Sequence, residues 1–171
     1  MKNLLFLACV TSLLVICIYY DQKKQELHPG DITFTFFDAD NDAFGIVAHV
    51  DIPSNTIVHF TDSEWNGNRF GFDENNLSWN TGGNKITAGT HINFTKLDTL
   101  PSVNIGFLKN KMKISKKEDA IFAYSGHTRM PSVFLAAAAN SVNAYGTLIN
   151  TGLQQGTSAL LFSGEPTAEA R

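Results

Sequence analysis

Apolar and polar residues alternate with a two-residue period from residue 31 onward, which is typical of half-buried β-strands. Three such segments, 31–36, 44–50 and 58–60, follow one another closely. The residues Asp-Ile-Pro-Ser-Asn at 51–55 favour a turn between the last two. We therefore expect these three segments to form an antiparallel meander in one sheet.

Shorter apolar segments continue to the end of the chain, separated by Gly, Asn, Pro and Lys clusters. The sequence predicts further strands at 77–81, 91–95, 111–115, 120–124, 132–137 and 158–162. The four alanines at 136–139 also suit a short helix, but the residues around them favour a strand. Many short strands with frequent turns predict an all-β fold, an antiparallel β-sandwich or a sandwich-like barrel over residues 30–163.

The N-terminus carries a different pattern, because residues 4–20 are mostly apolar and follow Lys2. As a helix this run spans about 25 Å, slightly less than a bilayer core of about 30 Å. Residues 1–20 are interpreted as a signal peptide or a membrane anchor, and both remain open. A polar linker at 21–29 and a polar tail at 164–171 flank the β-domain. We expect a secreted or cell-surface protein that meets the membrane only through its N-terminal segment.

Composition narrows the possible functions. The chain has 171 residues, of which 43% are hydrophobic, and this suits one globular domain. Its net charge of −3 argues against a nucleic-acid binder, which would carry a basic surface. Both cysteines, Cys9 and Cys17, lie in the N-terminal apolar run. The β-domain therefore has no disulfide, no thiolate metal site and no cysteine nucleophile.

Acidic residues follow the first and third predicted strands. In a meander these two turns lie at the same pole, so Asp38, Asp40 and Asp42 would approach Asp62 and Glu64. Carboxylates on flexible loops are ligands that Ca²⁺ prefers. The five residues are therefore a candidate calcium site. The alternative is that aspartates in turns cap their own backbone and stay solvated.

Aromatic residues gather in the irregular stretch 63–79. Trp65 and Trp79 would form a stacking platform for sugar rings, with Asn66 and Arg69 supplying polar contacts. In the alternative interpretation, the large rings fold inward and cap the end of the β-core.

Two further sets of residues have candidate roles. Lys109, Lys111 and Lys113 share one strand face, which predicts either a protected edge strand or contact with an acidic polysaccharide. His49 and His59 would share a face in the meander, but a zinc site needs at least a third ligand.

Three stretches together resemble a known module: GDITFTFFDADNDAFGIVAHVDIPSNTIVHFTDSEWNG, KKEDAIFAYSG and TGLQQGTSALLF. As an ordered set they are similar to a little-characterised all-β module of secreted bacterial surface proteins. The resemblance covers nearly all of residues 30–163. It implies an extracellular, sandwich-like domain used for attachment or recognition, with no catalytic residues to assign.

An enzymatic function is the remaining alternative. Glu64 with Asp73 or Glu74 would supply the two carboxylates that a small extracellular glycoside hydrolase needs. The chain has no phosphate-binding loop, zinc-protease helix or dinucleotide fingerprint. We therefore expect a non-catalytic module that binds an extracellular polysaccharide or surface protein, with Ca²⁺ as a candidate structural ion.

Overall fold

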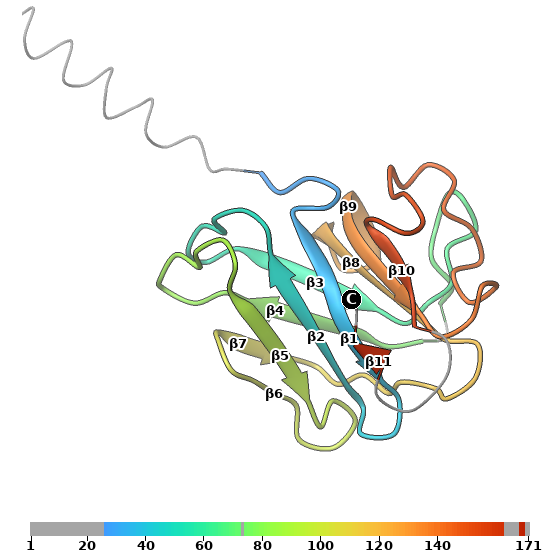
Figure 1. The fold of residues 1–171 in the computed structure, drawn as a ribbon, viewed down its shortest axis with the longest axis horizontal. Coiled ribbons are helices and arrows are strands. Elements are labelled where there is room, and N and C mark those ends of the chain that lie inside the picture. Colours follow the sequence, from blue (N-terminus) through green and yellow to red (C-terminus); the bar gives the residue numbers. More distant parts are fainter. Residues whose placement is uncertain (1–25, 73, 163–167, 170–171) are drawn as a thin grey trace, which may run out of the picture.

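The computed structural model describes residues 26–72, 74–162 and 168–169 (Figure 1). The predicted signal or anchor segment, most of the linker, Asp73 and most of the tail lie outside these residues. The strands are β1 (Ile32–Asp38), β2 (Ala43–Ala48), β3 (Ile57–Thr61), β4 (Asn76–Asn80), β5 (His91–Thr95), β6 (Ser102–Val103), β7 (Phe107–Lys109), β8 (Ala120–His127), β9 (Met130–Ala139), β10 (Ala159–Leu161) and β11 (Ala168–Glu169).

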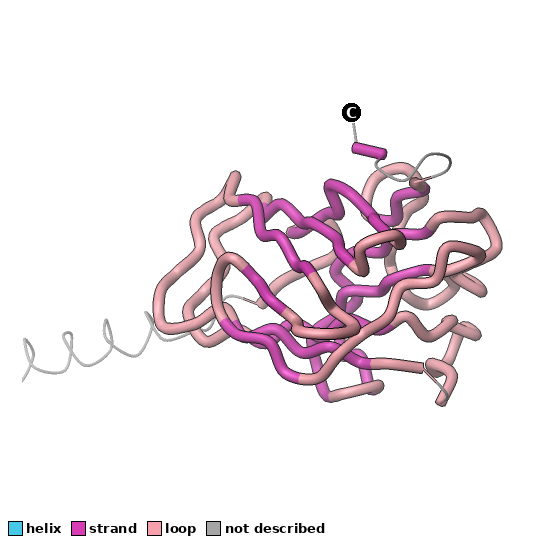
Figure 2. Tube along the Cα trace, turned by 90° about the horizontal axis from the view of Figure 1, so that it is seen from below, coloured by secondary structure: helices cyan, strands magenta, loops and turns pink. Residues whose placement is uncertain are grey.

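The strands form two sheets, which confirms the all-β, sandwich-like prediction. The first sheet has the order β11-β1-β2-β5-β6, and the second has the order β10-β9-β8-β3-β4-β7. Strands and loops make up the described part of the chain, which contains no helix (Figure 2). Accordingly, no described segment is a helix that could cross a bilayer.

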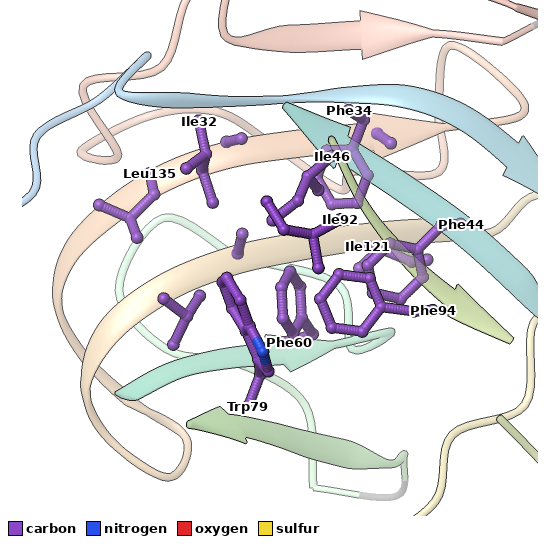
Figure 3. Packing of buried hydrophobic residues seen from close by; sticks show 14 of the residues in the cluster. Ile32, Phe34, Phe44, Ile46, Phe60, Trp79, Ile92, Phe94, Ile121 and Leu135 are labelled. Atoms are coloured by element: carbon purple, nitrogen blue, oxygen red, sulfur yellow. The ribbon is translucent and has the colours of Figure 1, made fainter. Parts of the chain in front are cut away.

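The core lies between the sheets, where the apolar residues of each alternating strand meet (Figure 3). Phe44 from β2 packs against Phe60 from β3 with ring centroids 4.9 Å apart, and against Phe94 from β5 at 4.5 Å. Trp79 from β4 meets Phe94 edge-on at 5.5 Å. Such ring pairs add to the hydrophobic gain of burial, so they help to hold the two sheets together.

The meander prediction is wrong, because β3 lies in the second sheet. Its neighbours are β8 and β4, while β2 pairs with β5 instead. The connection between β2 and β3 does not turn back as a hairpin. Its Ile52 is fully buried and forms an isolated β-bridge with Ile86. Through this connection the chain passes from the first sheet to the second. His49 follows the end of β2 in the first sheet, whereas His59 lies in β3 of the second, so the expectation that they share a face is also wrong.

The predicted strand at 111–115 is instead an extended crossover that leads from β7 to β8. Met112 and Ile114 are buried as the alternation requires, but their backbone N–H groups bond to loop residues and not to a neighbouring strand. The Met112 N–H donates to the Leu97 carbonyl at 3.0 Å, and the Ile114 N–H donates to Asp42 Oδ1 at 2.7 Å. The segment therefore closes one pole of the sandwich.

The strand predicted at 132–137 is confirmed within β9, but β10 pairs with β9 in parallel, so the second sheet is not purely antiparallel. Described residues outside 30–163 also take part in the fold. Leu27 belongs to the core, and β11 pairs with β1 at Phe36 and Phe37.

The bond from Ile114 to Asp42 makes a testable contribution to stability. We expect Asp42→Ala to lower the free energy of unfolding by about 2–3 kcal/mol, because it removes a charge-assisted bond and places alanine at a positive φ of 47°. Asp42→Asn keeps an acceptor and tolerates this φ, so it should remain near the wild type. Urea denaturation measures both. Equal losses in the two variants would contradict the role of the bond.

Candidate functional site

A polar groove of about 780 Å³ lies at the pole closed by the crossover. Asp40 and Asp42 reach it from the β1–β2 turn, and Asp62 reaches it from the end of β3. Glu74 and the crossover residues 113–119 complete its walls. Both predicted acidic turns therefore lie at one pole, although β3 reaches it from the opposite sheet.

Within this pole several of the candidate calcium ligands hold the backbone. Asp38 Oδ1 accepts the N–H groups of Asp40 and Asn41 at 3.0 and 3.1 Å. Asp62 Oδ1 accepts the Asn75 N–H at 2.7 Å, while Asp40 forms an ion pair with Lys116. The contacts of Asp38 are the turn-capping role of the alternative interpretation, whereas Asp62 bonds across the loop between β3 and β4 and Asp40 pairs with a crossover lysine.

Not all of the candidate calcium ligands lie in this groove. Glu64 is exposed in the loop after β3, outside the lining of the groove, whereas Glu74 is part of that lining. The described residues contain no group of three or more His, Cys, Asp or Glu side chains placed to hold a metal ion. Calcium binding therefore stays a prediction. The pair of carboxylates considered for a glycoside hydrolase, Glu64 and Glu74, does not share this groove.

Asp119 is the buried carboxyl of the groove that sequence reasoning missed. Its side chain accepts the N–H groups of Ser115 and Ala120, the latter at 2.8 Å. Burial, helped by the charges of Asp62 and Glu74, raises the pKa of this carboxyl to about 7, although those two hydrogen bonds act to lower it. Burial also raises the pKa of Asp62, which the bonds from Asn75 oppose. The signal in the sequence was an acid placed directly before a buried strand.

The raised pKa predicts that stability decreases as pH rises toward neutrality. A carboxyl whose pKa is higher in the folded state stabilises that state at low pH, and this contribution is lost as pH rises through about 7. Each tenfold difference in proton affinity between the folded and unfolded states corresponds to about 1.4 kcal/mol. Urea denaturation should therefore give a higher free energy of unfolding at roughly pH 5 than at roughly pH 8. Asp119→Asn should flatten this slope, and Asp98→Asn, at an exposed turn, should not. An unchanged slope in Asp119→Asn would refute the assignment.

The two tryptophans proposed as a sugar platform are buried in separate places. Trp65 is 5% exposed, and its Nε1 donates to the Ile149 carbonyl at 2.8 Å. Trp79 is fully buried and donates to the Ile105 carbonyl at 2.8 Å. Neither ring presents a face to a ligand in this structure, which matches the inward-folding alternative.

The remaining loop residues stay at the surface. Asn66 and Arg69 are exposed, and Asn66 Oδ1 accepts the N–H groups of Asn68 and Arg69 within the turn. Phe72 is 66% exposed, with the Arg69 guanidinium 5.4 Å from its ring centre. The four proposed glycan residues are thus not brought together as one site.

Trp65 instead belongs to a second apolar cluster on the outer face of the second sheet. Trp65 and Phe70 come from the loop after β3, and Tyr145 comes from the loop after β9. They pack on Phe122 of β8 and Phe134 of β9. The long loops after β3 and β9 lie beside β8, β9 and β10, away from β7 (Figure 1). One half of this outer face is therefore covered.

The other half, on β3, β4 and β7, presents two rows of side chains across the strands. Cα pairing places Ile57, Asn80 and Phe107 in one row, and His59, Ser78 and Lys109 in the next. Directly opposed residues point to the same side of a sheet. We call these six residues the open face.

The open face combines exposed apolar and polar groups. Ile57 is 48% exposed and Phe107 is 70% exposed, whereas their neighbours Val58 and Leu108 point toward the core. Lys109 is also exposed. His59 is mostly buried, and its Nδ1 lies 2.9 Å from Ser78 Oγ. Burial lowers the pKa of His59, which favours the neutral ring and a hydrogen-bonding role.

The sequence predicts β3 and β4 of the open face, but it predicts neither β7 nor the boundary of the face. That boundary depends on where distant loops fold. No known protein family, curated protein or solved structure matches this chain.

Proposed function

We propose that this protein is a non-catalytic extracellular attachment module that binds a surface glycan on its open face. The observation that carries the proposal is the exposed row Ile57–Asn80–Phe107, on the half of the outer sheet face that the loops do not cover. The apolar run at 4–20 supports export.

The chemistry of the open face suits a sugar better than a purely apolar partner. An exposed phenylalanine ring offers a flat surface to the C–H face of a pyranose. Asn80 and Ser78 are half-buried and fixed on strands, and amide and hydroxyl groups hydrogen-bond well to sugar hydroxyls. The three strands span about 10 Å from β3 to β7, because neighbouring strands lie about 4.8 Å apart. That width accommodates a short segment of a polysaccharide.

Binding of the full-length protein to a glycan array tests the proposal. We expect binding to a subset of glycans, and a loss of about tenfold or more in affinity for Phe107→Ala. Phe72→Ala is the matched control, because Phe72 is similarly exposed but lies outside the open face. Its binding should equal that of the wild type. Full binding by Phe107→Ala, or no glycan binding by the wild type, would refute the proposal.

We also propose Ca²⁺ as a structural ion of the polar groove. The proposal rests on the convergence of Asp40, Asp42, Asp62, Glu74 and Asp119 on one groove from three segments of the chain. The groove lining carries these five carboxyl groups and Glu118 against Lys113, Lys116 and Lys117, so a cation there would offset the remaining negative charge. Isothermal titration of chelator-treated protein should show binding heat, and the melting temperature should rise with Ca²⁺ concentration. If neither effect appears, the groove does not bind calcium.

A further inference from the structure

We infer that the glycan bound on the open face is an acidic polysaccharide, whose carboxylate or sulfate groups pair with Lys109. This inference rests on the proposed function and names the ligand class for the same surface.

The charge of the three strands supports an anionic ligand. Strands β3, β4 and β7 contain no Asp or Glu, and the charged residue among them is Lys109. Lys109 is the last residue of the row His59–Ser78–Lys109. Lys111, two residues further along the chain, is also exposed. The nearest acids in sequence, Asp62 and Glu74, line the polar groove beyond the ends of β3 and β4. The open face is therefore neutral to positive, while the acidic groups are gathered at the pole.

Phe107 and Lys109 have a spacing that lets one ligand contact both. Both side chains point outward from β7, two residues apart, which places them about 7 Å from each other along the strand. A sugar ring on Phe107 would bring the acid group of the same or the next unit to the lysine ammonium.

A second shallow depression continues the open face beyond Phe107. It has a volume of about 330 Å³, and its lining includes Asn84, Lys85 and Thr87. Lys85 is exposed and pairs with Asp51 at 2.6 Å. Exposed ion pairs of this kind are weak, so a polyanion can compete for the lysine. The depression extends the surface available to a chain that runs past Phe107.

The competing role for Lys109 is protection of an edge strand, since β7 is the last strand of its sheet. The two roles differ in the sign of charge that they require. Any charge discourages edge-to-edge association, but only a positive charge attracts an acidic polymer. Lys109→Glu therefore preserves edge protection and reverses the interaction with the ligand.

Affinity electrophoresis of the full-length protein through gels containing polygalacturonate, or a neutral galactan, tests this inference. We expect retardation by polygalacturonate that weakens with added salt, and little by the neutral polymer. Lys109→Glu should lose at least about tenfold in affinity and Lys109→Arg should retain binding. Lys117→Glu, with the same charge change in the crossover, controls for net charge and should bind like the wild type.

Each other outcome has a distinct meaning. Equal binding to both polymers, with Lys109→Glu unaffected, would overturn the acidic ligand and leave the proposed glycan-binding function intact. An equal loss of affinity in Lys109→Glu and Lys117→Glu would show that only the net charge of the protein matters, and would overturn the role of Lys109. Absence of binding to both polymers, together with a positive glycan array, would overturn the acidic class alone. A negative array would overturn both proposals.

Discussion

Replacing Trp79 with alanine is expected to lower the free energy of unfolding by about 3–5 kcal/mol. Trp79 is fully buried in β4, where its ring packs edge-on against Phe94. Its indole N–H also satisfies the Ile105 carbonyl just before β7. The substitution leaves a large cavity between the sheets and removes the donor for that carbonyl, so it destabilises both the core and the edge of the second sheet.

Urea denaturation with tryptophan and tyrosine fluorescence measures the effect, and two variants control it. Trp79→Phe keeps most of the buried surface but loses the indole N–H, so it should be destabilised by a smaller amount. Phe72→Ala removes an aromatic residue that is mostly exposed and should change stability by less than about 0.5 kcal/mol. A loss for Trp79→Ala no larger than that for Phe72→Ala would contradict its place in the core.

The alternation of apolar residues predicts most strands because it is a local property. Burial of Phe34, Phe44 and Phe60 on one side of their strands follows directly from the two-residue period. Sheet membership is not local. The residues 51–55 favour a turn, but whether the chain turns back or crosses to the other sheet depends on the partner of Ile52, which is Ile86, more than thirty positions away. Most of the longer strands were therefore predictable, whereas the short strands β6 and β7 and the true sheet order were not.

Some features of the candidate sites were likewise predictable from the sequence, and others were not. The acidic pole was predictable, since Asp40 and Asp42 lie in the turn after β1, Asp62 directly follows β3, and the two sheets of the sandwich share that pole. The fate of the loop aromatics was not predictable, because Trp65 becomes buried through the loop that supplies Tyr145 and Ile149, about eighty residues further along. The open face has the same origin: it is the part of the sheet that those loops leave uncovered.

Gly106→Ala is expected to destabilise the protein by about 2–5 kcal/mol and to weaken binding at the open face. Gly106 precedes β7 with a φ of 85°, a conformation that costs an L-residue about 1–2 kcal/mol. A Cβ there would overlap the Asn80 backbone oxygen and lie 2.8 Å from Trp79 Nε1. Because these are the backbone of β4 and a fully packed ring, the edge strand itself must shift, at a further cost of about 1–3 kcal/mol.

Gly71→Ala provides the matched control, because a Cβ at exposed Gly71 meets nothing within 4 Å and the residue lies outside the open face and its neighbouring depression. Its stability should stay within about 0.5 kcal/mol of the wild type, as is usual for a surface position. Binding should separate the two variants further, since Gly106→Ala displaces the strand that carries Phe107 and Lys109. Wild-type glycan affinity in Gly106→Ala, despite the lost stability, would show that the ligand does not depend on β7. The open face would then have to be reassigned to β3 and β4 alone.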